Sequence, residues 1–510
     1  MKRLFLTITA LLMFVATMSA GGKLTLPDIT SGKFAAKTVN GINPIEGTDT
    51  YARISQDGER VVCCSFKTGK ELSVFFDVKN TMGCKIDGFD DYVLSPDGKR
   101  MLIQTKTERI YRRSFKADFY IYNIESRRLD RLSDGDKQQI PTWSPDGQQV
   151  AFVRGGNIFL VKLLYDNAEI QVTKDGKFNE VINGLPDWVN EEEFGFNSAL
   201  TFNADGTMIC WIRYDESKVK TYSLEMYKGM KPAKEEYDTY PGLYSYKYPK
   251  AGEDNSTVSA WSYDIKSHKI NRLQVPLDAD GYMPRIKPTN DPMRIIVYTM
   301  NRHQDDLCLY AVNPRSTVAQ LIIKEHVDKY VREEAMEGVK FVGDKILLPS
   351  DRSGYTKLYI YNMNGQLQRT IGDGNYDITS VYGYDPKTGD VYYQAAALGA
   401  TDRQVYVTHK NGKTVRLTDR EGWNTAFFSG DFQYFVNTWS DYNTPYVFTT
   451  RTREGKLINT IEDNKAVKQL VSDYGFCKRE PFSFTTSEGV VLNGWMVKPK
   501  DFDANKKYPV

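Results

Sequence analysis

The segment WSPDGQQVAFVRGGNIFLV, residues 143–161, contains a turn and strand pattern that recurs along the chain. A Ser-x-Asp-Gly turn precedes a short apolar strand, a Gly-Gly turn and a second apolar strand, which together predict an antiparallel hairpin. Related turns stand at 55–58 (SQDG), 95–98 (SPDG) and 203–206 (NADG), so successive copies are 40 to 59 residues apart. Meanders of short strands repeated at this spacing predict the blades of a β-propeller.

A second repeated unit supports the same fold class. FYIYN at 119–123 and LYIYN at 358–362 are each followed by a polar turn and a further short strand. Aromatic residues make up 13% of the chain, an excess that favours strands. At roughly 50 residues per blade, residues 46–475 predict an all-β, eight-bladed β-propeller, with seven blades as the alternative count. A set of unrelated sandwiches would leave the recurring turns unexplained.

The charge balance excludes broad electrostatic partners. Lys and Arg number 67 and Asp and Glu 65, so the formal net charge is +2. This balance provides no basic field for nucleic acid or anionic lipid. Hydrophobic residues at 41% and charged residues at 26% are typical of a soluble globular protein. We therefore expect no nucleic-acid partner and no membrane association.

Residues 1–20 have the layout of a secretory signal peptide. Lys2 and Arg3 precede a largely apolar run over residues 4–16, and small residues end the segment. The run is too short to span a bilayer comfortably. We expect a secreted or periplasmic protein. A buried N-terminal helix is the alternative.

The cysteines and histidines are too widely spaced to predict a disulfide framework or a metal site. The six cysteines are Cys63, Cys64, Cys84, Cys210, Cys308 and Cys477. Export would allow disulfides, but the pairing cannot be deduced from spacing, and buried thiols are the favoured interpretation. The four histidines are His268, His303, His326 and His409. They lack metal-ligand spacing, so we predict no metal and no cofactor.

Residues 215–250 interrupt the repeats with a polar insertion rich in Tyr and Lys. Long insertions in repeat proteins project as loops or arms from one face. The insertion predicts an arm through which two copies of the chain form a homodimer. A flexible surface loop is the alternative interpretation.

The segment DWVNEEEFGF, residues 187–196, places three consecutive carboxylates between aromatic residues. Like charges held together repel, so the site must either solvate them or supply a cation. A run of glutamates alone is usually a solvated face. The flanking Trp188, Phe194 and Phe196 instead favour a site for a primary ammonium group, which offers three N–H donors and a compact charge.

Several motifs together resemble the dipeptidyl peptidase IV group of the prolyl oligopeptidase family of serine peptidases. They are the DWVNEEE segment, YPKAG at 248–252, SDRSGYTKLYIYN at 350–362 and the terminal KKYPV. The resemblance begins near LTLPDI at 24–29 and covers the rest of the chain. It implies an eight-bladed propeller that caps an α/β-hydrolase domain, and cleavage of X-Pro or X-Ala dipeptides from free peptide N termini.

The resemblance also implies site residues. Glu192 and Glu193 would hold the substrate α-ammonium, with Glu191 as a neighbour. Arg112 matches a family arginine that orients the carbonyl of the first substrate residues, although a solvated surface arginine is the usual state of this residue type. Arg332, in KYVREEAM, corresponds to a further family arginine. An ammonium anchored at a fixed distance from a nucleophile would make binding geometry into cleavage specificity.

The catalytic residues of such a peptidase are not found in this sequence. A serine hydrolase of this fold needs a nucleophile in a GxSxG turn, followed in the chain by Asp and His. No serine in residues 1–510 has glycines two positions before and after it. The segment at 482–499 matches the entry hairpin of the hydrolase domain. We therefore expect a truncated chain that holds no catalytic residue and is inactive alone.

The expected organisation has four parts. They are a signal peptide (1–20), an N-terminal segment that packs on the hydrolase domain (21–45), the propeller (46–475, with the arm at 215–250) and the start of a truncated α/β-hydrolase domain (476–510). A noncatalytic periplasmic propeller that binds peptides or a protein partner is the alternative function. Within the enzyme class, a tripeptide-releasing relative is a second alternative, and the intact glutamate pair favours dipeptides.

Overall fold

The computed structural model describes residues 24–165, 167–231 and 233–509. The predicted signal peptide at 1–20 lies outside these residues. None of the helices in the described ranges has the length and apolar character needed to cross a lipid bilayer.

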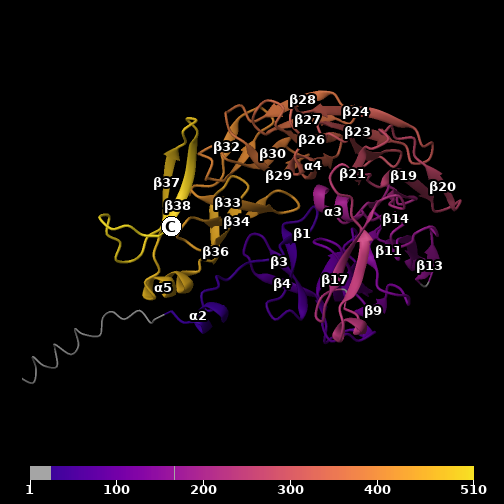
Figure 1. The fold of residues 1–510 in the computed structure, drawn as a ribbon, viewed down its shortest axis with the longest axis horizontal. Coiled ribbons are helices and arrows are strands. Elements are labelled where there is room, and N and C mark those ends of the chain that lie inside the picture. Colours follow the sequence, from indigo (N-terminus) through magenta and orange to yellow (C-terminus); the bar gives the residue numbers. More distant parts are fainter. Residues whose placement is uncertain (1–23, 166, 232, 510) are drawn as a thin grey trace, which may run out of the picture. The chain divides into compact units, whose positions relative to one another are not determined.

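The fold is an eight-bladed β-propeller, as the repeats predicted, and the alternative count of seven is wrong. Eight sheets follow one another in chain order, and we number them blades 1 to 8 (Figure 1). Neighbouring strands within each blade are antiparallel, except that β5 joins β9 of blade 2 in parallel. Blades 2 and 4 each have a fifth strand.

Blade 1 consists of β1 (Asn43–Pro44), β2 (Thr50–Ile54), β3 (Arg60–Ser65) and β4 (Glu71–Asp77), and blade 2 of β5 (Met82–Gly83), β6 (Asp91–Leu94), β7 (Arg100–Arg109), β8 (Phe115–Asn123) and β9 (Arg128–Arg131). Blade 3 consists of β10 (Gln139–Trp143), β11 (Gln149–Arg154), β12 (Asn157–Lys162) and β13 (Ala168–Gln171). Blade 4 consists of β14 (Val181–Asn183), β15 (Leu200–Phe202), β16 (Met208–Asp215), β19 (Thr257–Asp264) and β20 (Lys269–Arg272). Blade 5 consists of β21 (Tyr282–Pro288), β22 (Ile295–Met300), β23 (Asp306–Val312) and β24 (Ala319–His326), and blade 6 of β25 (Lys340–Val342), β26 (Lys345–Ser350), β27 (Lys357–Asn362) and β28 (Leu367–Ile371). Blade 7 consists of β29 (Ile378–Asp385), β30 (Asp390–Ala395), β31 (Gln404–Thr408) and β32 (Thr414–Arg416). Blade 8 consists of β33 (Trp423–Phe428), β34 (Tyr434–Ser440), β35 (Val447–Thr452) and β36 (Leu457–Glu462).

The chain divides into two compact units. Unit 2, residues 54–62 and 73–373, contains blades 2 to 6. Unit 1 contains blades 7 and 8, the helices α2 (Leu26–Thr30) and α5 (Lys465–Asp473), and the hairpin of β37 (Arg479–Thr485) and β38 (Val491–Val497). The strands of blade 1 are divided between the two units.

The three Ser-x-Asp-Gly turns at 55–58, 95–98 and 144–147 share one hydrogen-bonding scheme. At 95–98, the Ser95 hydroxyl donates to Asp97 Oδ1 at 2.6 Å and accepts from the N–H of Arg100 at 2.9 Å. Gly98 has a φ of 68°, a conformation that costs glycine little and other residues more. The turn therefore fixes the register of the hairpin that follows it.

The core of unit 2 lies between neighbouring blades. One large cluster joins buried apolar residues of blades 4, 5 and 6, including Ile212, Tyr298 and Leu348. All six residues of β22 are buried, because side chains on both faces of this blade 5 strand pack against other blades. A strand covered on two sides is apolar throughout rather than alternating.

The insertion at 215–250 forms a hairpin. Strand β17 (Thr221–Met226) pairs with β18 (Gly242–Lys247), and the short helix η2 (Glu235–Asp238) lies in the connection. The hairpin is anchored at its base, where Tyr248 packs on Trp188 with ring centroids 4.2 Å apart. The segment is thus an ordered arm attached beside blade 4.

The six cysteines all lie in the described ranges, and none of them forms a disulfide there. Cys63, Cys64 and Cys210 are buried, as the favoured interpretation of the sequence expected, whereas Cys84 and Cys308 are half-buried and Cys477 is exposed.

Candidate functional site

The glutamate run lies on the short helix α3 (Trp188–Phe194) of blade 4. The helix begins after Asp187, whose Oδ1 accepts from the N–H of Asn190 at 2.9 Å. It ends where Gly195 adopts a left-handed conformation, with φ 70° and ψ 28°. Burial raises the pKa of the Asp187 carboxyl, which also accepts a hydrogen bond from Ser256. Both ends of the helix are therefore fixed by local contacts.

Glu191 points into the protein and holds the loop between β7 and β8. Its side chain is buried, and Oε1 accepts from the N–H groups of Arg113 at 2.7 Å and Ser114 at 2.8 Å. In return, Arg113 Nη1 donates to the Glu191 carbonyl at 3.3 Å, and Asn197 Nδ2 donates to the Arg113 carbonyl at 3.1 Å. This network positions the neighbouring Arg112.

Glu192 and Glu193 point away from that network. Glu192 Oε1 lies 3.0 Å from Arg112 Nη2, and the Arg112 side chain is 71% exposed. Glu193 is exposed and has no ion-pair partner within the described parts of the chain. The structure therefore brings three of the predicted site residues together, with carboxylate and guanidinium groups open to an incoming polar ligand.

A second helix approaches the end of α3. Helix α4 (Glu333–Glu337) begins at Glu333, whose Oε1 lies 3.7 Å from Arg113 Nη2. A Cβ on Gly195 would lie 1.5 Å from the same oxygen. A larger residue at this position would therefore displace the Glu333 carboxylate from its place beside Arg113, in addition to the cost of the positive φ.

Arg332 is held by a different set of partners. Its Nε lies 3.2 Å from Asp351 Oδ2, and its Nη2 donates to Thr356 Oγ1 at 2.5 Å. Both partners belong to the connection between β26 and β27 of blade 6. The structure therefore ties Arg332 to blade 6, next to Glu333, and within the described ranges no ion pair joins it to the glutamates of α3.

Arg285 is a supporting residue that the sequence analysis missed. It is 2% exposed in β21, where Nη2 donates to the carbonyl of Phe194 at 2.5 Å and lies 3.2 Å from Glu337 Oε2. Its guanidinium also lies 4.6 Å from the ring centre of Phe196. Arg285 thereby joins the end of α3 to α4. The only sequence signal is an arginine within an otherwise largely apolar strand.

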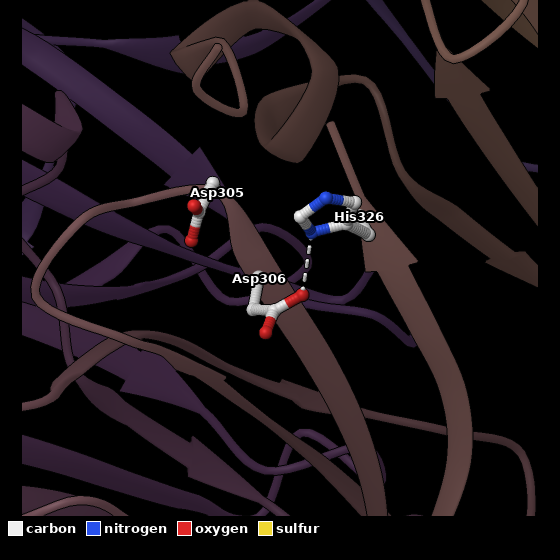
Figure 2. A group of neighbouring side chains, drawn as sticks. All are labelled: Asp305, Asp306 and His326. Atoms are coloured by element: carbon white, nitrogen blue, oxygen red, sulfur yellow. Dashed lines mark hydrogen bonds and ion pairs between the residues drawn. The ribbon is translucent and has the colours of Figure 1, made fainter. Parts of the chain in front are cut away.

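One group of side chains has the donor types of a metal site. Asp305, Asp306 and His326 place their ligand atoms within 4.8 Å of one another at the end of the β23–β24 pair (Figure 2). His326 Nδ1 lies 2.9 Å from Asp306 Oδ1, and Lys324 Nζ lies 3.1 Å from Asp306 Oδ2. Asn301 Nδ2 donates to Asp305 Oδ1 at 2.6 Å. Each carboxylate already has a protein partner, so the contacts describe a cross-strand ion network.

The fold and the site together define a class: a β-propeller with an anionic helix inserted in its fourth blade. The chain belongs to the family of the dipeptidyl peptidase IV (DPP IV) N-terminal region, whose model matches residues 95–446. The family resemblance seen in the sequence motifs is thereby confirmed.

Several relatives are dipeptidyl peptidases. Dipeptidyl peptidase 4 of Trichophyton equinum is 27% identical over 447 residues, which cover 83% of this chain and 56% of the relative. A probable dipeptidyl-aminopeptidase B of Podospora anserina is 29% identical over 450 residues, which cover 82% of this chain and 47% of the relative. This chain thus spans about half the length of the curated relatives it matches.

Solved structures share the fold. The crystal structure of Porphyromonas gingivalis dipeptidyl peptidase 4 has a TM-score of 0.91 and 36% identity, covering 96% of this chain and 69% of that chain. A putative dipeptidyl aminopeptidase IV from Bacteroides ovatus has a TM-score of 0.74 at 19% identity, which shows a common fold alone.

Proposed function

We propose that this chain is the propeller and N-terminus-binding part of a serine exopeptidase that releases X-Pro or X-Ala dipeptides. The observation that carries the proposal is the division of the glutamate run on α3. Glu191 is buried in backbone contacts, whereas Glu192 and Glu193 remain available beside the exposed Arg112.

The binding chemistry follows from the charges. A peptide α-ammonium has three N–H donors and one positive charge, and Glu192 and Glu193 offer carboxylate acceptors. Arg112 reduces the repulsion between them and offers planar donors to a substrate carbonyl. Each charged hydrogen bond contributes about 1.5–3 kcal/mol, so a free N terminus has a clear advantage over an acetylated one.

The same geometry would set the length of the released fragment. When the ammonium is anchored, one peptide bond at a fixed distance along the substrate reaches the nucleophile. In this proposal an α/β-hydrolase domain supplies that nucleophilic serine with its His and Asp partners. Residues 476–510 form the first part of that domain, 46–475 the propeller, and 21–45 a segment that packs on the hydrolase domain.

Export and dimerisation complete the proposal. Residues 1–20 direct the protein to the periplasm or out of the cell. The arm joins two copies in a homodimer, for which the exposed Tyr222, Leu224 and Leu243 provide apolar surface. Shortening the hairpin to a Gly-Ser turn should convert a dimer to a monomer in sedimentation experiments.

Peptide binding to the chain tests the central claim. We expect a peptide with free Ala-Pro at its N terminus to bind at least about 30-fold more tightly than its N-acetylated form, since about 2 kcal/mol is lost with the ammonium. The variant Glu192→Gln with Glu193→Gln should remove this difference, measured by isothermal titration calorimetry.

A matched control variant changes the net charge by the same amount as the test variant. Glu125→Gln with Glu488→Gln alters two exposed glutamates in turns and should leave the 30-fold preference intact. Equal binding of free and acetylated peptides by the unaltered chain would contradict the proposal and favour a noncatalytic propeller. In the full-length peptidase, turnover of X-Y-Pro in preference to X-Pro substrates would instead indicate tripeptide release.

A further inference from the structure

A cavity of about 920 Å³ lies at the base of the arm in unit 2. Its volume is within the range of small-molecule sites, about 300–1,000 Å³. Glu192 and Glu193 do not line it. The apolar part of its wall consists mainly of Ile110, Tyr111, Phe178, Leu185, Trp188 and Tyr244.

Glu216 provides a buried carboxyl group in the wall of this cavity. Glu216 is 6% exposed, and it follows directly after β16 in the chain. A backbone hydrogen bond from Asn179 reaches the carboxylate. Within the described ranges, no Lys, Arg or His nitrogen lies within ion-pair distance of it. Lys247, whose charge acts on Glu216, donates instead to the carbonyls of Ser217 and Val219.

The other three acids of the wall are satisfied by the protein, and one of them, Glu108, pairs with Lys116 and Lys137. Asp187 accepts from Ser256 and Asn190, and Glu191 accepts from two backbone N–H groups. Burial, reinforced by the nearby Asp187, raises the pKa of Glu216 to about 7. Within the described ranges Glu216 is thus a buried acid without an ion-pair partner, although basic side chains also line the cavity, and the apolar part of the cavity gives room for a ligand that brings a cation to it.

We propose that the cavity binds a small ligand in which a primary ammonium group is attached to an aromatic or apolar body. The ammonium group pairs with the Glu216 carboxylate, and the body packs against the aromatic wall. Tyr111, Tyr244 and Trp188 also line the cavity, and aromatic rings attract the same charge by cation–π interaction. This site is separate from the proposed peptide site and does not depend on it.

Ligand-observed fluorine NMR tests the proposal with 4-fluorophenethylamine as the probe. The matched control is 2-(4-fluorophenyl)ethanol, which has the same body and a hydroxyl in place of the ammonium. Measurements at pH 8 keep the Glu216 carboxyl ionised. The protein used is the full chain carrying Glu192→Gln and Glu193→Gln, so that binding at α3 does not contribute.

We expect the amine to bind this protein at least tenfold more tightly than the alcohol. Adding Glu216→Gln should remove that preference, while the melting temperature shows that the variant is folded. Phe178→Ala changes an exposed part of the wall, so it leaves the core intact and should weaken amine binding at least threefold.

Three results would overturn the proposal. They are no amine binding in the Glu192→Gln, Glu193→Gln protein, equal binding of amine and alcohol, and binding that is unchanged by Glu216→Gln. None of these results bears on the peptide experiment, because that experiment reads discrimination at α3 alone.

Discussion

Glu191→Ala separates the structural glutamate of α3 from the glutamates proposed to bind substrate. The substitution removes the acceptor of two N–H groups, those of Arg113 and Ser114. Ser114 is buried, so its N–H would lose a partner that water replaces poorly. The loop that carries Arg112 would then be held less firmly.

The size of the effect follows from these two hydrogen bonds. An unsatisfied buried group costs about 1–3 kcal/mol, so the pair should cost about 3 kcal/mol. Unfolding entropy of about 2.1 cal/mol/K per residue, over the roughly 310 residues of unit 2, gives about 0.65 kcal/mol/K. The melting temperature of Glu191→Ala should therefore fall by about 5 °C.

Glu193→Ala is the matched control, because it makes the same chemical change on the same helix. Glu193 is exposed, so its removal should change stability by less than about 0.5 kcal/mol and the melting temperature by less than about 1 °C. Its effect should appear in peptide binding, where the preference for a free N terminus over an acetylated one falls about tenfold. Glu191→Ala should retain most of that preference.

Calorimetric melting and peptide titration on the two variants decide the matter. The reasoning fails if Glu191→Ala has the same melting temperature as the unaltered protein, since the two backbone hydrogen bonds would then contribute nothing to stability. It also fails when Glu193→Ala lowers the melting temperature as much as Glu191→Ala does.

Two further predictions concern the buried Glu216 and two glycines of unit 2. Because burial raises the Glu216 pKa from 4.5 to about 7, the folded state binds the proton more tightly, and the unaltered protein should lose about 3 kcal/mol as pH rises from 4.5 to 7. The melting temperatures of Glu216→Gln and the unaltered protein should thus agree near pH 4.5 and differ by about 5 °C, in favour of the variant, at pH 8; a constant difference would contradict the assignment. Gly98→Ala, at φ 68° in open space, should cost about 1 kcal/mol. Gly195→Ala, at φ 70°, should cost more because its Cβ meets Glu333, and adding Glu333→Ala should bring its melting temperature back to that of Gly98→Ala; equal values for the two single variants would refute this.

The repeat architecture could be predicted because its signal is local. Four Ser-x-Asp-Gly or Asn-x-Asp-Gly turns are visible in the sequence, and each has a glycine with positive φ. A fifth turn at 429–432 uses the same bonds, with Ser429 donating to Asp431 at 2.6 Å. Phe432 takes the place of glycine at φ 57°, and its ring stacks on Tyr392. Packing thus supports a strained residue, and a search for the glycine of the repeat does not detect this turn.

The contacts around α3 could be predicted only in part. The glutamate run and Arg112 are local motifs with a family resemblance. The partnership of Glu191 with Arg113, by contrast, joins residues 78 positions apart, and Arg285 reaches Phe194 across 91. Asp306 and His326 likewise meet through strand register. Sequence spacing predicts none of these, because they depend on which blades adjoin and how their strands pair.

Three consecutive glutamates on a helix cannot share one function. Successive side chains are about 100° apart around the helix axis, so one of three neighbours must turn toward the protein when the other two face outward. Here Glu191 is the inward residue, and its carboxylate is stabilised by backbone N–H groups rather than by a cation. The two outward side chains then leave the helix about 100° apart, and in the proposed function a compact ammonium group binds between their carboxylates. Arg112 pairs with Glu192 while its own side chain stays 71% exposed. The order buried, paired and open along residues 191–193 is thus a consequence of helix geometry and of the loop against which the helix packs.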